Sequence, residues 1–274
     1  MKFRPLMSGF GIWNLEFGVW LFSPSPFKVQ SSRFKVQGLV LLLSSLLAAS
    51  ALANSDASFI AGTQAYHAGD YATAAQAFRE SAARHPSSGT LQNLGLAEWQ
   101  RGLAGPAVLA WEQSLSLDPF NKATRMNLRF ARKTVQLEAP DLTWYEVLST
   151  WLPVNWWAWI ASISFWLTIA IALLPGILRL RKAAWHQAVA ALGLMLFLLT
   201  LPALAGVHTR SRLGFVLQKD TPLRLTPTQE AQPITRLAAG EPARWAKPRG
   251  NYVLIRTSRG LGWVERAQFG LMAR

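Results

Sequence analysis

Two long stretches without charged side chains are the clearest pattern in this chain. No Asp, Glu, Lys or Arg lies in the 32 positions between Glu146 and Arg179, or in the second stretch from Ala183 to Thr209. A helix rises about 1.5 Å per residue, so about 20 apolar residues cross a hydrocarbon layer of about 30 Å. Seven of the 13 tryptophans lie between Trp144 and Trp185, as in the aromatic belts of membrane proteins. We therefore predict an interfacial segment over 141–151 and a hairpin of two membrane-spanning helices, 152–178 and 187–207, joined by a loop over 179–186.

The charges around this hairpin predict its orientation. The loop carries Arg179, Arg181 and Lys182 and no acidic residue, whereas Asp141 and Glu146 precede the first span. Short loops rich in Lys and Arg stay in the cytoplasm, so residues 54–140 and 208–274 should both face outward. The basic residues that follow the second span argue for the opposite orientation: His208, Arg210, Arg212 and Lys219. A hairpin cannot satisfy both groups, and we expect the short loop to decide.

A shorter apolar run near the N-terminus predicts export. The 15 residues from Leu39 to Ala53 are uncharged, follow Arg33 and Lys35, and end in Ala-Leu-Ala. This order is typical of a secretory signal peptide, which predicts cleavage after Ala53; the alternative is a retained anchor. Residues 1–53 then comprise a low-complexity N-terminus and a signal peptide with its apolar region at 39–53. The repeated Phe-Lys-Val-Gln upstream favours a true translation start near Val29.

The segment that follows the signal contains an internal repeat with a period of 33 residues. The offset aligns Gly62 with Gly95, Tyr66 with Trp99, Gly69 with Gly102, Ala74 with Ala107, Phe78 with Trp111 and Pro86 with Pro119. Small residues let two helices approach closely, an aromatic side chain fills the space between them, and proline ends the second helix. We predict helical hairpins over 56–86 and 89–119, followed by a capping helix over 122–138. Two repeats and a cap form a marginal array, which a neighbouring membrane or partner would stabilise.

This spacing and residue order resemble the tetratricopeptide repeat over residues 54–140, although Ser58 and Leu91 stand where an early tryptophan is common. The resemblance implies a concave groove lined by the first helix of each repeat. The helical stripe that would face this groove consists of Phe59, Thr63, Tyr66, Gln92, Leu96, Trp99, Met126, Phe130 and Lys133. Its aromatic character predicts binding of an apolar peptide. The alternative is that Tyr66 and Trp99 are core residues.

The C-terminal segment changes to a strand-like pattern. Turn signals recur at Thr226-Pro227, Ala239-Gly240, Arg249-Gly250 and Arg259-Gly260, with alternating residues between them. Short strands at this spacing predict a small all-β barrel over 208–274. The run from Tyr252 to Val264 predicts a hairpin, and the order resembles the bacterial SH3-like domain. We expect Trp263 in the barrel core, and Trp245 and Tyr252 as exposed aromatic contacts.

The composition supports a membrane protein with a basic C-terminal domain. Charged residues make up only 15% of the chain and hydrophobic residues 51%, against roughly 25% charged in ordinary soluble domains. Of the formal charge of +14, residues 208–274 contribute +8, from twelve basic and four acidic groups. An exported domain does not meet nucleic acid, so we expect no nucleic-acid partner. Anionic lipid headgroups or an acidic partner would explain the excess, and a solvated basic face is the alternative.

The sequence offers no pattern typical of catalysis. Cysteine is absent, the four histidines are scattered, and there is no HExxH, Walker loop or nucleophile elbow. The acidic residues are isolated and suit helix faces and caps. We therefore expect no enzyme activity, no catalytic residue, no cofactor and no metal site.

Taken together, these segments predict a multi-domain membrane protein: all-α tetratricopeptide helical hairpins, a two-helix transmembrane hairpin and a small all-β SH3-like barrel. This order over residues 39–274 resembles the BatE-type proteins of bacterial aerotolerance operons. The resemblance implies a noncatalytic scaffold in the bacterial inner membrane, with both folded domains in the periplasm. It also implies protein partners, among them the von Willebrand factor A-type membrane proteins of related operons. The alternative is a membrane-anchored module that binds peptidoglycan through the barrel.

Overall fold

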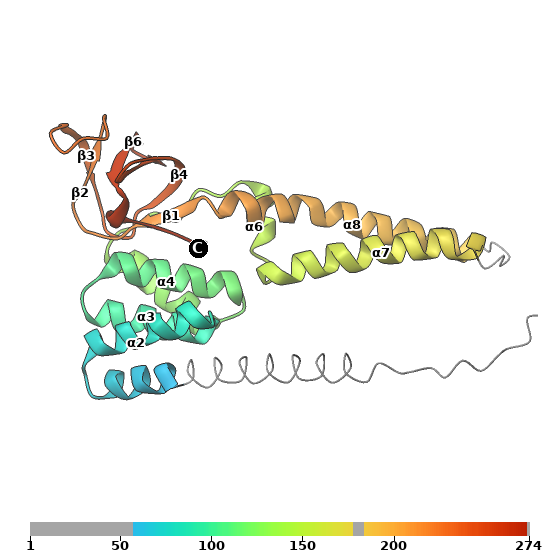
Figure 1. Cartoon of the computed structure of the whole chain (residues 1–274), viewed down its shortest axis with the longest axis horizontal. Coiled ribbons are helices and arrows are strands. Elements are labelled where there is room, and N and C mark those ends of the chain that lie inside the picture. Colours follow the sequence, from blue (N-terminus) through green and yellow to red (C-terminus); the bar gives the residue numbers. More distant parts are fainter. Residues whose placement is uncertain (1–56, 178–183, 273–274) are drawn as a thin grey trace, which may run out of the picture. The chain divides into compact units, whose positions relative to one another are not determined.

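The computed structural model describes residues 57–177 and 184–272 (Figure 1). All described residues belong to one compact unit. The predicted signal peptide, its cleavage site and the alternative start near Val29 lie outside the described residues. So do Arg179, Arg181 and Lys182, on which the predicted orientation rests.

The first described part is an array of antiparallel helices. It comprises a helix over 57–67, α2 (Tyr71–Arg84), α3 (Ser88–Gln100), α4 (Ala104–Leu117) and α5 (Lys122–Thr134). The bounds of α2 and α4 are separated by 33 residues at both ends, which is the period of the sequence repeat. Polar side chains begin the helices, because Asp70, Ser87 and Asn121 each accept a hydrogen bond from the third backbone N–H that follows. Hydrogen bonds from Thr73 also lower the pKa of Asp70.

The glycines of the repeat are positions of close helix approach. A Cβ atom added at Gly62 would lie 2.8 Å from the ring of Phe78, and one added at Gly95 would lie 2.4 Å from Nε1 of Trp111. Both aromatic side chains are fully buried. The Trp111 indole also donates a hydrogen bond of 3.2 Å to the Gln92 carbonyl. The small-residue and aromatic positions that repeat in the sequence are therefore partners in space.

Helix α5 ends earlier than the sequence predicts, at Thr134 instead of residue 138. Gln136 adopts a left-handed backbone with φ of 54°, and the Leu137 N–H donates to the Arg132 carbonyl. This is a helix-ending geometry. It turns Leu137 toward the core that contains Val108 and Trp111. The predicted length of the capping helix is therefore wrong, because a tertiary contact of Leu137 takes the place of a further helical turn.

The next part contains a short helix and two long apolar ones. These are α6 (Trp144–Ser149), α7 (Val154–Ile177) and α8 (Ala184–Arg210). Helices α7 and α8 run side by side and are long and apolar enough to cross a membrane (Figure 1). Most of their large apolar side chains are exposed, whereas the face of α8 in contact with its neighbours carries small residues: Gly193, Thr200, Ala203 and Gly206.

The C-terminal part is an antiparallel seven-stranded sheet. Its strands are β1 (Leu213–Val216), β2 (Thr221–Arg224), β3 (Pro233–Leu237), β4 (Pro242–Arg249), β5 (Tyr252–Thr257), β6 (Gly260–Glu265) and β7 (Phe269–Leu271). Their order is β3-β2-β6-β5-β4-β1-β7, and a single 3₁₀ turn, Arg266–Gln268, precedes β7. Strands β5 and β6 form the predicted hairpin, with Val253 opposite Val264. Trp263 is buried, as predicted.

The helical array and the sheet share one hydrophobic core. Ala107, Val108, Trp111, Leu128 and Ala131 of the array pack with Leu213 and Phe215 of β1. Two glycines allow this approach: a Cβ at Gly105 would lie 2.4 Å from the Leu217 carbonyl, and one at Gly240 would lie 2.6 Å from Leu137. The sequence predicts two separate folded segments and does not predict that the sheet covers α4.

Candidate functional site

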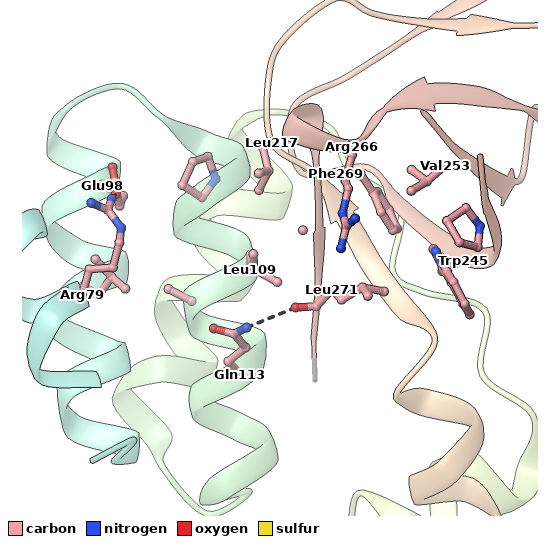
Figure 2. A pocket seen from close by; sticks show the side chains of 15 residues that line it. Arg79, Glu98, Leu109, Gln113, Leu217, Trp245, Val253, Arg266, Phe269 and Leu271 are labelled. Atoms are coloured by element: carbon pink, nitrogen blue, oxygen red, sulfur yellow. Dashed lines mark hydrogen bonds and ion pairs between the residues drawn. The ribbon is translucent and has the colours of Figure 1, made fainter. Parts of the chain in front are cut away.

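A cleft of about 640 Å³ lies where the helical array meets the sheet (Figure 2). Its volume is in the range of small-ligand and peptide sites. The helical side is lined by Arg79, Leu94, Glu98, Pro106, Leu109, Ala110 and Gln113. The sheet side is lined by Leu217, Trp245, Pro248, Val253, Arg266, Phe269, Gly270 and Leu271. Most of these side chains are apolar, so the cleft is suited to an apolar ligand.

Strand β7 is the sheet edge at this cleft, and its backbone groups are largely paired. The Gln113 side-chain amide reaches from α4 and donates to the carbonyls of Leu271 and Met272, at 3.2 Å each (Figure 2). The Phe269 N–H donates to the Arg266 carbonyl in the turn before β7. Because these groups are occupied, the edge has little capacity to add a further strand. The cleft therefore offers side chains, rather than backbone, for recognition.

Trp245 brings its indole ring to the sheet side of this cleft. The pairing of β4 with β5 shifts register between Trp245 and Lys247, which re-aims the side chains at this point. Trp245 is half-buried against the core of the sheet, and its backbone N–H donates to the Arg212 carbonyl at 2.7 Å. The structure thus places the predicted contact residue Trp245 at the cleft, on β4.

Two arginines at the cleft differ in their availability. Arg79 is paired with Glu98, which is almost fully buried and also accepts a hydrogen bond of 2.8 Å from Arg101. Arg266 is exposed, and its side chain makes no ion pair within the described ranges. Arg266 is therefore the cation at this cleft that can meet an acidic group of a ligand.

Tyr252, the second predicted contact of the sheet, is not exposed. Only 9% of its surface is accessible. Strand β5 lies between β4 and β6, where Tyr252 pairs with Arg249 on one side and Glu265 on the other. The prediction of an exposed Tyr252 is therefore wrong, because the hairpin position next to Gly250 belongs to a central strand.

The predicted groove stripe divides into two sets. The side chains of the first set make contacts inside the helical array. Phe59 packs against Phe78, and Tyr66 packs edge-on against Tyr71. Thr63 donates its hydroxyl to the Phe59 carbonyl at 3.0 Å. The Gln92 side-chain oxygen accepts hydrogen bonds from Asn121, at 2.9 Å, and from Thr124. Phe59, Tyr66 and Gln92 thus contact neighbouring helices, whereas the Thr63 hydrogen bond lies within its own helix.

The second set forms an exposed aromatic patch on α3 and α5. Met126 and Phe130 are 68% and 61% exposed, and Lys133 is also exposed. Trp99 is half-buried and contacts the Phe130 ring edge-on, with ring centroids 5.9 Å apart. Leu96 and Trp99 also pack against the shared core below. The structure thus brings together only the C-terminal part of the predicted stripe.

A buried ion pair joins the sheet to the segment before α7. The Arg244 guanidinium donates to both carboxylate oxygens of Glu146, at 2.7 Å each, and to the Asp141 carbonyl at 2.8 Å. Burial of Glu146 opposes its ionisation, but the hydrogen bonds from Arg244 and Thr143 outweigh this and lower its pKa to about 2. The same bonds raise the pKa of Arg244. The sequence did not predict this pair; the spacing of Thr143 and Glu146, a helix-capping box, was the available signal.

No group of three or more His, Asp or Glu side chains is placed to hold a metal ion among the residues that the structure describes. Buried carboxylates in the core, Glu98, Glu112 and Glu146, are each paired with arginine. The polar side chains at the cleft can therefore orient a bound ligand, but they form no arrangement of nucleophile and base. Comparison of the sequence with protein-family models and with curated proteins, and of the structure with solved structures, finds no match.

Proposed function

We propose that this chain is a noncatalytic membrane-anchored scaffold that holds an apolar segment of a protein partner in the cleft between the helical array and the sheet. The cleft of about 640 Å³ carries this proposal, because apolar side chains from both parts converge on it around Trp245. Such a site offers a large apolar contact area with few polar groups to fix orientation. The exposed Arg266 adds a preference for a segment that carries an acidic side chain beside its apolar residues.

The apolar hairpin supplies the anchor in this proposal. Helices α7 and α8 expose large apolar side chains, such as Trp166 and Leu199, along lengths sufficient to span a bilayer. Two crossings leave the flanking segments on the same side. The shared core of array and sheet agrees with this arrangement, since α4 and β1 can pack together only in one compartment. The charges of the loop over 179–186 favour the periplasm of a bacterial inner membrane as that compartment.

The resemblance to BatE-type proteins is part of this proposal. The helix bounds repeating at 33 residues, with Gly62 and Gly95 against aromatic rings, support a tetratricopeptide array. The antiparallel strands separated by short turns support an SH3-like domain. In a BatE-like complex, the partners would be membrane proteins of the von Willebrand factor A type. The cleft, rather than the concave stripe alone, would then receive their apolar segment.

Site-specific photocrosslinking in cells that naturally make the protein tests the proposal. A benzoylphenylalanine replaces Trp245, one aromatic group for another, and the adduct is mapped by mass spectrometry. We expect an adduct with an apolar segment of a membrane protein. The same probe at Leu225, which is 71% exposed on the loop after β2, should give no such adduct. The Arg266→Glu variant should reduce the yield at Trp245 about tenfold, which corresponds to a loss of about 1.4 kcal/mol in binding free energy.

Three results would contradict the proposed site. Equal adducts at Trp245 and Leu225 would mean that the cleft has no specific role. A yield unaffected by Arg266→Glu would contradict the proposal that the partner segment carries an acidic side chain. A glycan adduct at Trp245, together with sedimentation of the full chain with purified peptidoglycan, would favour the cell-wall-binding alternative.

The exposed patch on α3 and α5 gives a separate prediction. Met126 and Phe130 contribute little to the core, so Met126→Ser and Phe130→Ser should change the melting temperature by no more than about 2 °C. If this patch extends the partner site, the double variant will weaken crosslinking at Trp245 while the fold persists. An unchanged crosslink would restrict the site to the cleft. Circular dichroism and the crosslinking yield are the two measurements.

A further inference from the structure

A second cavity, separate from the cleft, lies at the end of the apolar hairpin. Its volume is about 470 Å³. It is lined by Glu112, Leu115, Pro119, Arg125, Leu128, Arg129, Arg132, Ala139, Pro140, Leu142, Thr150, Arg210 and Leu213. These residues come from α4, α5 and the loop between them, the segment before α6, the ends of α6 and α8, and β1. No residue is shared with the cleft that contains Trp245.

The cavity is strongly positive. Four arginines face one glutamate, which is a formal excess of three positive charges. Arg132 pairs with the carboxylate of Glu112, and Arg125 donates to the Pro119 carbonyl. Arg129 has no hydrogen bond or ion pair among the described side chains, so its five donors are available. Burial raises the pKa of Glu112, and the charges of Arg132 and Arg210 oppose this rise.

Arg210 ties the cavity to the hairpin. It is the last residue of α8, and one of its terminal nitrogens donates to the Ser149 hydroxyl at 3.2 Å. Its Nε is buried and lacks a hydrogen-bond partner among the residues described. Buried polar groups in proteins are nearly always paired, and this nitrogen is a donor that an anion bound in the basic cavity can use.

The surroundings place this cavity at the level of lipid headgroups. Arg210 and Thr150 stand at the two hairpin ends nearest the folded parts, immediately beside the apolar lengths of α8 and α7. Trp144 and Trp151, 70% and 63% exposed, flank the same segment, as is typical of tryptophans at a membrane surface. The apolar part of the lining, Leu115, Leu128, Leu142 and Leu213, can contact glycerol and the first acyl carbons.

From this geometry we infer that the arginine cavity binds the phosphate headgroup of an anionic phospholipid. Guanidinium groups match phosphate with two parallel hydrogen bonds, and basic pockets beside membrane helices bind anionic headgroups. The occupant would hold the helical array, the end of α8 and the membrane surface together. A bound anion also accounts for the position of Arg210. This residue follows the second span on the outward-facing side, where membrane proteins carry few cations, and the anion would neutralise its charge.

Thermal unfolding of the full chain in a neutral detergent tests this inference. The added ligands are short-chain phosphatidylglycerol, short-chain phosphatidylcholine and inorganic phosphate. The double variant Arg125→Gln with Arg129→Gln removes two guanidiniums, and Arg129→Gln alone removes one without breaking a described contact. Arg249→Gln is the matched control, because Arg249 is an exposed arginine at the end of β4, outside the cavity.

We expect phosphatidylglycerol to raise the melting temperature of the wild type and of Arg249→Gln, with no rise from phosphatidylcholine or inorganic phosphate. The midpoint concentration should increase about tenfold in Arg129→Gln and further in the double variant. Equal protection by inorganic phosphate would assign the cavity to the free anion and overturn the lipid inference. Equal protection by phosphatidylcholine, or an unchanged midpoint in Arg129→Gln at an unchanged starting melting temperature, would overturn it as well.

Discussion

Replacing Arg244 with glutamine should destabilise this protein more than replacing its partner Glu146 with glutamine. Glu146 is fully buried, whereas the Arg244 side chain is one-third exposed. Arg244→Gln therefore leaves a buried carboxylate without its cation, which costs about 3 kcal/mol or more in the free energy of unfolding. In Glu146→Gln, the remaining guanidinium can reach water. Thermal unfolding of the full chain in detergent, followed by tryptophan fluorescence, measures both.

The same pair predicts a stability loss in acid. The pKa of Glu146 is about 2 in the folded protein, below its ordinary value of 4.5. A lowered folded-state pKa contributes stability above the unfolded value, and that contribution disappears as the pH falls from about 4.5 toward 2. We therefore expect the wild type to lose melting temperature over this range more steeply than Glu146→Gln. Glu138→Gln, which removes an exposed carboxylate, should follow the wild type. Parallel curves for all three proteins would contradict this assignment.

Removal of the Trp111 side chain should unfold the helical array and loosen the sheet together. Trp111 is only 1% exposed and belongs to the core that contains Leu213 and Phe215 of β1. Trp111→Ala should cost about 3–5 kcal/mol, because a large cavity opens between the two parts. Gly95→Ala should cost about 1–3 kcal/mol, since the added methyl group meets the same ring.

Phe120→Ala is the control for these two variants, because Phe120 is an equally apolar aromatic residue that is 62% exposed. It should change the melting temperature little. Hydrogen exchange adds the decisive measurement: in Trp111→Ala, amides of β1 and α4 should lose protection in parallel. Loss of protection in α4 alone would mean that the sheet is stable without the array, contrary to a shared core.

Local sequence patterns predicted much of this fold, because many of its elements depend on residues that lie close together in the sequence. The pairs Gly62 with Phe78 and Gly95 with Trp111 lie within single helical hairpins, so one repeat unit encodes both partners. The uncharged stretches predicted α7 and α8, and the turn signals fall between strands of the sheet. The prediction of a mixed protein with two long apolar helices and an antiparallel sheet is confirmed.

The features that the sequence did not predict depend on contacts between distant segments. Glu146 and Arg244 are 98 positions apart, and nothing near either residue indicates the other. The cleft exists only because Leu109 of α4 approaches Gly270 of β7. Tyr252 was predicted to be an exposed contact, but strand order decides burial and is not a local property. The identity of a partner likewise stays a prediction.

The common interior of α4 and β1 has a consequence for biosynthesis. The ribosome completes α4 well before β1, and both apolar helices of the hairpin are made in between. Until β1 emerges, the part of the α4 core that packs against Leu213 and Phe215 lacks these two partners and is covered only by the neighbouring helices. A chain interrupted after α8 would therefore expose this apolar surface to chaperones and proteases. We therefore expect a chain truncated after α8 to accumulate less than the full chain.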